Sequence, residues 1–300
     1  MRVAWLWRTA SLLLAGSALA WAWLCARAGH PLVGLAGALL IGGVHAPLMA
    51  VEAIVLHRVN RRDPAPAPTA AERLRAWAAE VVGAVVVFGW RQPWRWAQHP
   101  DSAGAPGQRG VVLVHGFVCN RGLWHPWRAR LQAAGVPVIA LNLEPVFGPI
   151  DGYAPAIDAA VQRIAQATGR PPLLVGHSMG GLAIRAWLRA SGADARVHGV
   201  VTIGSPHHGT WTAARIGRLP LANARQMRLG DAWLRALAAA EPAARRARFT
   251  CFYSHCDNIV FPASSATLPG ADNRHLRGRA HVHLLRDPAV LAEVLRRLRD

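Results

Sequence analysis

The serine at position 178 lies in a stretch that can make a hydroxyl group reactive. Residues 173–181 read L-L-V-G-H-S-M-G-G, so an apolar run leads into a G-x-S-x-G pentad, and a helical pattern follows over residues 182–190. A strand, a sharp turn and a helix in this order form a nucleophile elbow, which presents the serine above a sheet. At Gly176 or Gly180 a side chain would collide with the neighbouring strand or helix. We therefore predict that Ser178 is a nucleophile.

A nucleophilic serine needs a base for its proton and a carboxylate that orients the base. With this kind of elbow, the acid and then the histidine follow the serine along the chain. Downstream, Asp257 lies in a loop after a strand-like run, and His281 and His283 lie in a loop before the last helix. The order of residue types predicts a Ser-Asp-His triad.

The oxyanion that develops during attack on an ester needs N–H donors. Phe117 lies just after the first strand-like run, and its backbone N–H, together with that of Met179, would point at the carbonyl oxygen of a bound ester. Gly116 lets the backbone approach the substrate closely. His115 is interpreted as a structural residue that bonds the loop backbone beside this oxyanion hole. One such donor contributes roughly 3–4 kcal/mol to transition-state stabilisation.

The elements that must position these residues alternate between strand and helix from Val111 onward. Such alternation predicts parallel strands joined by right-handed crossovers, which is an α/β layered fold. The expected strands are residues 111–115, 136–141, 173–175, 197–203 and 249–254, and the expected helices are residues 124–134, 153–168, 182–190 and 288–298.

Several motifs then occur together in one order, namely V-L-V-H-G-F, G-H-S-M-G-G-L, T-I-G-S-P-H-H-G-T, Y-S-x-x-D-x-I-V and G-x-x-H-x-x-L-L. Through these motifs, residues 111–299 resemble the bacterial triacylglycerol-lipase and esterase branch of the α/β-hydrolase superfamily. The resemblance implies an α/β-hydrolase fold, a mostly parallel central sheet flanked by helices, over residues 111–300. It also implies carboxylic ester hydrolysis without a cofactor.

The resemblance assigns the site residues more narrowly. It places the base at His281 rather than at His283. It favours Asp257 as the acid over two other carboxylates, Asp151 and Asp231.

Residues 1–60 have the composition of membrane-embedded helices. Residues 9–26 are an uncharged run with tryptophans near both ends, Trp5, Trp7, Trp21 and Trp23. In an α-helix the two tryptophan pairs lie about 25 Å apart, which suits the two faces of a bilayer core. Residues 32–51 form a second apolar run, so the sequence predicts a helical hairpin that spans the membrane twice. The alternative is a secretory signal peptide that is cleaved after Ala20.

The arginines predict the orientation of this hairpin. Arginines precede the first run and follow the second, whereas Arg27 alone lies between them. By the positive-inside rule, both termini and the catalytic domain lie on the cytoplasmic side of a bacterial inner membrane. Residues 61–110 are expected to be a linker that contains a third apolar stretch, residues 76–90, with Glu80 inside it. We interpret this stretch as an interfacial or packed helix; if it crossed the membrane, the catalytic domain would face outward.

Composition limits the other classes of function. The net charge is +18, but all 34 basic residues are arginines scattered along the chain, without an aromatic-interleaved basic stripe, so nucleic-acid binding is not predicted. An anionic membrane surface is the more suitable partner for this charge. The cysteines do not make a disulfide framework; Cys251 and Cys256 are close enough to pair, but Cys251 is better explained as a core residue. His207 and His208 lack acidic or cysteine partners at ligand spacing, so we predict a structural role rather than a metal site.

Residues 210–248 form a helical, arginine-rich insertion between two expected strands. Such insertions often cover an active site and shape its acyl pocket. The apolar residues Trp211, Leu219, Leu221, Trp233 and Leu234 would either line that pocket or pack in the ordinary amphipathic way.

Together these observations predict a membrane-anchored serine hydrolase of lipid-like carboxylic esters. Two alternatives stay open at this point. The same triad would serve an acyltransferase or a thioesterase, and a hydrolase fold without turnover would make a membrane-anchored interaction protein.

Overall fold

The computed structural model describes residues 2–216 and 221–300. Its core is a sheet in which six strands of the described residues run parallel, in the order β2-β1-β3-β4-β5-β6. The strands are β1 (Val111–Val114), β2 (Val138–Ala140), β3 (Leu173–His177), β4 (Gly199–Ile203), β5 (Phe249–Tyr253) and β6 (Asp272–His275). This is the predicted α/β-hydrolase sheet, with β6 as an edge strand that the polar sequence D-N-R-H did not suggest.

Helices cover both faces of the sheet, as a parallel sheet requires. Successive side chains of a strand point to opposite faces, so Val112 and Val114 of β1 pack in one cluster while Val111 and Leu113 pack in another. The first cluster contains residues of α7 (Ala154–Thr168) and α8 (Met179–Ser191). The second contains residues of α6 (His125–Ala133) and α13 (Pro288–Arg299).

The insertion between β4 and β5 is helical, with α9 (Trp211–Ile216), α10 (Ala222–Gln226), α11 (Ala232–Ala239) and α12 (Ala243–Arg246). Leu234 is buried in the first cluster, and Trp233 packs against it and donates from Nε1 to an Asp151 oxygen at 2.6 Å. These two residues therefore serve ordinary packing. Leu219 lies outside the described residues.

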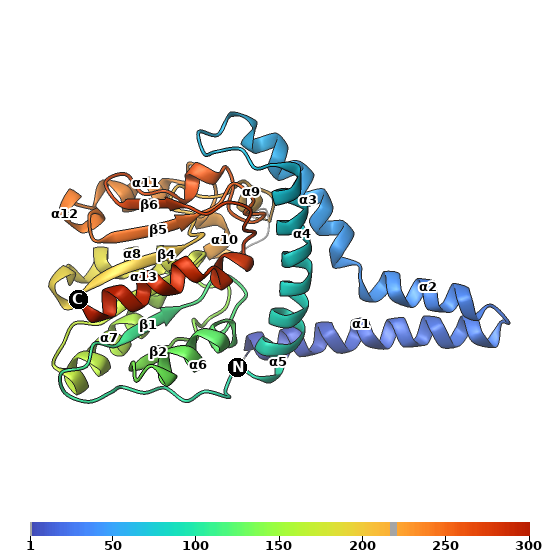
Figure 1. Cartoon of the computed structure of the whole chain (residues 1–300), viewed down its shortest axis with the longest axis horizontal. Coiled ribbons are helices and arrows are strands. Elements are labelled where there is room, and N and C mark those ends of the chain that lie inside the picture. Colours follow the sequence, from blue (N-terminus) through green and yellow to red (C-terminus); the bar gives the residue numbers. More distant parts are fainter. Residues whose placement is uncertain (1, 217–220) are drawn as a thin grey trace.

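The elements of the N-terminal third are the helices α1 (Arg2–Arg27), α2 (Pro31–Gly42), α3 (His45–Val59), α4 (Ala70–Ala84) and α5 (Gln92–Trp94), with the π-helix η2 (Val85–Arg91) between the last two. In Figure 1, α1 and α2 run side by side away from the sheet, whereas α3 and α4 lie along one end of it. Short 3-10 turns complete the chain at η1 (Asn60–Arg62), η3 (Arg121–Trp124), η4 (Ile150–Tyr153), η5 (Asp194–Arg196), η6 (Ala263–Ala266) and η7 (His283–Arg286).

The second expected membrane span, residues 32–51, is not one helix. The helix is interrupted at Gly42 and Gly43, and the helices on the two sides of the break are bent by 49° relative to each other. Consecutive glycines favour a helix end because they lack side chains that hold the helical backbone. At 12 residues, α2 is about 18 Å long, whereas the hydrocarbon core is about 30 Å thick, so α2 alone is too short to cross it.

Among the described residues, α1 is the single helix that is long and apolar enough by itself to cross a membrane. None of the residues in its apolar stretch is buried, which suits either a membrane anchor or a signal sequence. Its first turns, however, dock on the domain, because Val3 and Ala4 are buried and Trp7 Nε1 donates to the carbonyl oxygen of Val118 at 3.0 Å. Trp7 therefore takes part in a contact with the domain, which the sequence did not indicate.

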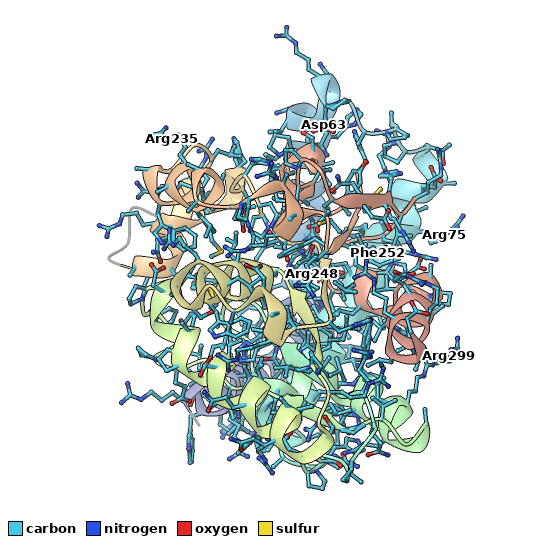
Figure 2. The ribbon with its side chains drawn as sticks, turned by 90° about the vertical axis from the view of Figure 1, so that its left-hand side faces the viewer. Asp63, Arg75, Arg235, Arg248, Phe252 and Arg299 are labelled. Carbon is cyan, nitrogen blue, oxygen red and sulfur yellow. The ribbon has the colours of Figure 1, made fainter. Side chains whose placement is uncertain are left out.

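The arginines do not form one charged face. Figure 2 shows Arg75, Arg235 and Arg299 at well-separated positions on the outline of the molecule. Other arginines are paired inside the fold, as in the fully buried ion pair between Arg185 and Glu241 at 2.6 Å. This dispersal agrees with the absence of a basic stripe in the sequence.

Candidate active site

Ser178 occupies the turn between β3 and α8. Its backbone has φ 55° and ψ −128°, a conformation that costs a non-glycine residue about 1–3 kcal/mol and that clusters at functional sites. The strain is held by surrounding structure, because β3 and α8 are buried on either side and the Ser178 N–H donates to the carbonyl oxygen of Ile203 at 2.9 Å. The sharp turn expected from the pentad is present.

The three predicted glycines leave no room for a side chain. A Cβ atom at Gly180 would lie 2.2 Å from the carbonyl oxygen of Val114, and one at Gly176 would lie 2.6 Å from the backbone nitrogen of Gly181. A Cβ at Gly116 would lie 2.8 Å from the Ser178 Cβ and 3.2 Å from its hydroxyl oxygen. The Phe117 loop therefore passes directly over the serine.

His281 and Asp257 are in contact. The Nδ1 atom of His281 lies 2.9 Å from Oδ2 and 3.0 Å from Oδ1 of Asp257, and both residues are buried. The carboxylate is itself held in place, because its Oδ1 accepts the backbone N–H groups of Ile259 and Val260 at 2.9 and 2.8 Å. The acid therefore has one orientation, and it fixes the tautomer in which Nε2 of the imidazole is free to accept a proton.

The charge of this environment favours protonation of His281. Burial lowers the pKa of the imidazole, but the negative charge of Asp257 and its hydrogen bond act against burial, with smaller contributions from Glu80 and Glu52. The net result is a His281 pKa above its ordinary value of 6.5. General acid–base catalysis is most efficient when the pKa of the base lies near the pH at which the enzyme works.

The rival residues lie in other surroundings. His283 contacts the Arg279 guanidinium at 3.3 Å, and burial together with nearby arginines lowers its pKa to about 4. Asp231 caps α11 by accepting the N–H of Trp233 at 2.9 Å, and Asp151 forms an ion pair with Arg189. None of the three contacts the Asp257–His281 pair in the described part of the chain.

The loop that carries Phe117 is hydrogen-bonded to α5, one of the N-terminal helices. Buried Gln92 accepts the N–H of Asn120 at 2.6 Å through its side-chain oxygen, and its own carbonyl accepts the Asn120 side chain at 2.9 Å. Val118 adopts φ 50°, so the loop turns sharply next to Phe117. The Met179 N–H belongs to the first turn of α8 and has no partner within that helix, which leaves it available to an anion.

Four residues near the triad were not anticipated from the sequence. The His177 ring lies 4.5 Å from the His281 ring, centroid to centroid, and a Cβ at Gly204 would meet Asp257 Oδ2 at 2.8 Å. Asn258 accepts the backbone N–H of His281, and Glu80 accepts the backbone N–H of the next residue, Val282. Glycine at 204 followed a strand and was a usable signal, whereas no local pattern marked Glu80.

The remaining histidines and cysteines have structural surroundings. His115 contacts the Gly116 carbonyl at 2.9 Å and accepts the N–H of Leu143 at 3.0 Å, and His207 contacts Thr202 at 3.0 Å. All four cysteines are free, and Cys251 is buried in the core. Among the described residues, no group of three or more His, Cys, Asp and Glu is placed to hold a metal ion.

Comparisons with known proteins agree with this architecture. A lipase from Bacillus licheniformis, BlEst2 in its mature form, superposes with a TM-score of 0.55 at 19% identity over 66% of this chain and 95% of its own. Lipase B of Aspergillus fumigatus superposes with a TM-score of 0.53 at 21% identity over 63% of this chain and 52% of its own. At these identities the likeness concerns the fold. No curated protein matched the sequence.

The comparison with family models identifies the family as well as the fold. Residues 111–298 match the Alpha/beta hydrolase family, which is more than half of the chain. The match begins at β1 and ends in α13, so it contains the sheet, the elbow and both loops described above. The chain therefore belongs to the Alpha/beta hydrolase family.

Proposed function

We propose that this protein is a membrane-anchored serine hydrolase that cleaves lipid-like carboxylic esters. The observation that carries the proposal is the buried contact of His281 with Asp257, 2.9 Å long, in a chain that also holds Ser178 in a strained turn. Membership of the hydrolase family and the lipase neighbours support ester hydrolysis.

The reaction follows from the roles of three side chains. The Ser178 hydroxyl oxygen attacks the ester carbonyl carbon while Nε2 of His281 takes the hydroxyl proton, and Asp257 stabilises the resulting imidazolium. The N–H groups of Phe117 and Met179 stabilise the negative oxygen of the tetrahedral intermediate. The C–O bond to the alcohol then breaks, and His281 returns its proton to the leaving alkoxide.

The acyl-enzyme is resolved by water. His281 removes a proton from the water molecule as its oxygen attacks the acyl carbon, and the proton passes to Ser178 when the carboxylic acid departs. The atoms and charges balance without a cofactor. Transfer to another alcohol or thiol instead of water would give an acyltransferase from the same first step.

The membrane part of the proposal rests on α1 and α2. Their outward side chains are large and apolar, including Leu13, Leu19 and Leu39, which are exposed to 67%, 71% and 67%. We propose that α1 is inserted in the bilayer with α2 at its side, and that the arginine distribution keeps the hydrolase on the cytoplasmic side of a bacterial inner membrane. The ester bond of a membrane lipid would then lie within reach of the domain.

The test is hydrolysis of p-nitrophenyl esters of increasing acyl length by the detergent-solubilised full chain. The wild type should turn over with an optimum at medium or long chains, and Ser178→Ala should lower kcat by about 10⁴-fold or more. Ser191→Ala is the matched control, because Ser191 bonds the Trp187 carbonyl at the far end of α8.

A fluorophosphonate probe separates the alternatives. Labelling of the wild type and of Ser191→Ala, but not of Ser178→Ala, without ester turnover would indicate an activated serine with another acceptor or substrate. A folded wild type that is neither labelled nor active would contradict the hydrolase proposal and favour the interaction protein.

A further inference from the structure

Glu80 is a carboxylate of α4 that lies inside the hydrolase domain. Only 3% of its surface is exposed. Its Oε1 accepts the backbone N–H of Val282 at 2.9 Å, and its Oε2 accepts those of Val282 and His283, each at 3.0 Å. These are the two residues that follow His281, so the carboxylate fixes the backbone that carries the catalytic imidazole.

A second carboxylate reaches the same loop from α3. Glu52 Oε2 accepts the side-chain N–H of Asn258 at 3.1 Å, and Asn258 Oδ1 accepts the backbone N–H of His281 at 3.3 Å. Asn258 directly follows Asp257. Two successive hydrogen bonds therefore connect Glu52 of α3, through Asn258 in the Asp257 loop, to the backbone of His281.

Packing alone does not explain Glu80 at this position. Burial raises the pKa of Glu80 to about 7, although the amides of Val282 and His283 favour its ionised form. Taking a carboxylate out of water costs several kcal/mol, which its hydrogen bonds have to offset. The chain thus places a costly side chain where it can bond the histidine loop.

The carboxylates also act on His281 through charge. Asp257 from its own loop, Glu80 from α4 and Glu52 from α3 all favour the protonated imidazole. On the remaining side, His177 of β3 is buried and desolvation keeps its pKa well below the ordinary value, so it brings little charge. The electrostatics of the base therefore depend partly on helices that lie outside the family match.

We propose that Glu80 and Glu52 are positioning residues for His281, so that the N-terminal helices α3 and α4 are an integral part of the catalytic apparatus. This inference rests on the proposed serine hydrolase function. It assigns to residues 45–84 a role beyond connecting an anchor to an enzyme.

The test uses the full chain in detergent with Glu80→Gln, which keeps the size of the side chain and removes its charge. Displacing a catalytic group slightly by a distant change costs up to about 10²-fold, so we expect kcat to fall by about 10- to 100-fold with KM within about twofold. Fluorophosphonate labelling should slow by the same factor. The pKa of Glu80 is about 7, so Glu80 carries its charge on the upper part of the acidic limb, and there its removal should move the kcat/KM profile to lower pH.

Glu72→Gln is the matched control, because Glu72 also belongs to α4 and also reaches the C-terminal region, through Arg277 at 2.8 Å. Glutamine still serves at the third position of the capping box with Thr69, and surface ion pairs contribute little. This variant should keep the wild-type rate and pH profile. If Glu80→Gln fails to fold, Glu52→Gln provides the same readouts, since Glu52 is only partly buried.

The outcomes are distinct. A folded Glu80→Gln with kcat within twofold of wild type overturns the inference while leaving the hydrolase function intact. A loss of rate that follows only the folded fraction, with an unmoved acidic limb, overturns it as well, because it indicates a structural role. If the wild type itself is neither labelled nor active, the proposed function fails, and the positioning role fails with it.

Discussion

The two N-terminal helix pairs, α1/α2 and α3/α4, both contain apolar stretches but are used differently. The leucines of α1 and α2 point outward. The two helices pack closely against each other, because Gly37 of α2 has no side chain and lies against the Trp21 ring of α1. The α3/α4 pair turns toward the sheet and inserts Glu52 and Glu80 into the loops of the candidate site. The large apolar side chains of α1 and α2 thus face outward, whereas Glu52 and Glu80 lie on the faces of α3 and α4 that dock on the domain.

Among changes to the two helix pairs, the largest effect on activity is expected from removing both carboxylates of the α3/α4 pair. Glu52 and Glu80 bond different atoms of the loops, so their effects should largely multiply, and Glu52→Gln/Glu80→Gln should lower kcat by about 10³-fold. Steady-state ester hydrolysis measures the loss, and circular dichroism checks the fold. A folded double variant with the rate of either single variant would show that the two residues act as one unit.

A smaller effect is expected on the pH profile. The pKa of His281 is raised above 6.5 by a set of carboxylates that includes this pair. Activity requires the neutral base, so the rate of the wild type should rise with pH through that raised pKa and should be low at pH 5. The kcat/KM profile of the wild type between pH 5 and 9 measures this limb. A limb centred below pH 6 would contradict the proposed environment of the imidazole.

Two tryptophans offer a direct contrast between the pairs. Trp77 Nε1 donates to the Ala46 carbonyl between α4 and α3 at 3.1 Å, and Trp21 Nε1 donates to the Val33 carbonyl between α1 and α2 at 3.3 Å. Each bond contributes about 1 kcal/mol at most. We expect Trp77→Phe to lower kcat by about two- to fivefold, because it loosens the helices that hold the site. Trp21→Phe should leave kcat unchanged. If Trp77→Phe and Trp21→Phe changed kcat equally, the two helix pairs would not differ in their support of the site.

The smallest effect on catalysis is expected from charging α1. An arginine at the centre of a membrane helix costs about 2.5–3.5 kcal/mol, so Leu13→Arg should shift the protein out of the membrane fraction. Hydrolysis of a short, soluble ester should stay within twofold of wild type, because the Leu13 side chain is exposed rather than packed on the domain. The nearby Ser17→Ala serves as the control for fractionation. An equal loss of soluble-ester turnover would indicate that the anchor also supports the site.

The fold could be predicted because its signal is local. Alternating strands and helices indicated the parallel sheet, and the pentad indicated the turn at Ser178, with its non-glycine φ of 55°. The edge strand β6 was missed because its four residues are polar and pair with β5 alone. Residues 32–51 were read as one span because hydropathy averages over the Gly42–Gly43 break.

The supports of the site could not be predicted for a different reason. Glu80 and Val282 are separated by 202 positions, and Glu52 and Asn258 by 206, so no spacing rule connects them. In the sequence, Glu80 argued only against a membrane span. Its partners are backbone N–H groups, which every residue but proline possesses, and such partners leave no trace in side-chain types.

The separation of 202 positions also has a consequence for protein synthesis. Chains emerge N-terminus first, so α3 and α4 are complete long before the ribosome reaches the loop of His281. The elbow serine and its acid are likewise made before the base. The contact between His281 and Asp257 can therefore form only after synthesis has passed residue 281, when the helices that bond the His281 loop have long been synthesised.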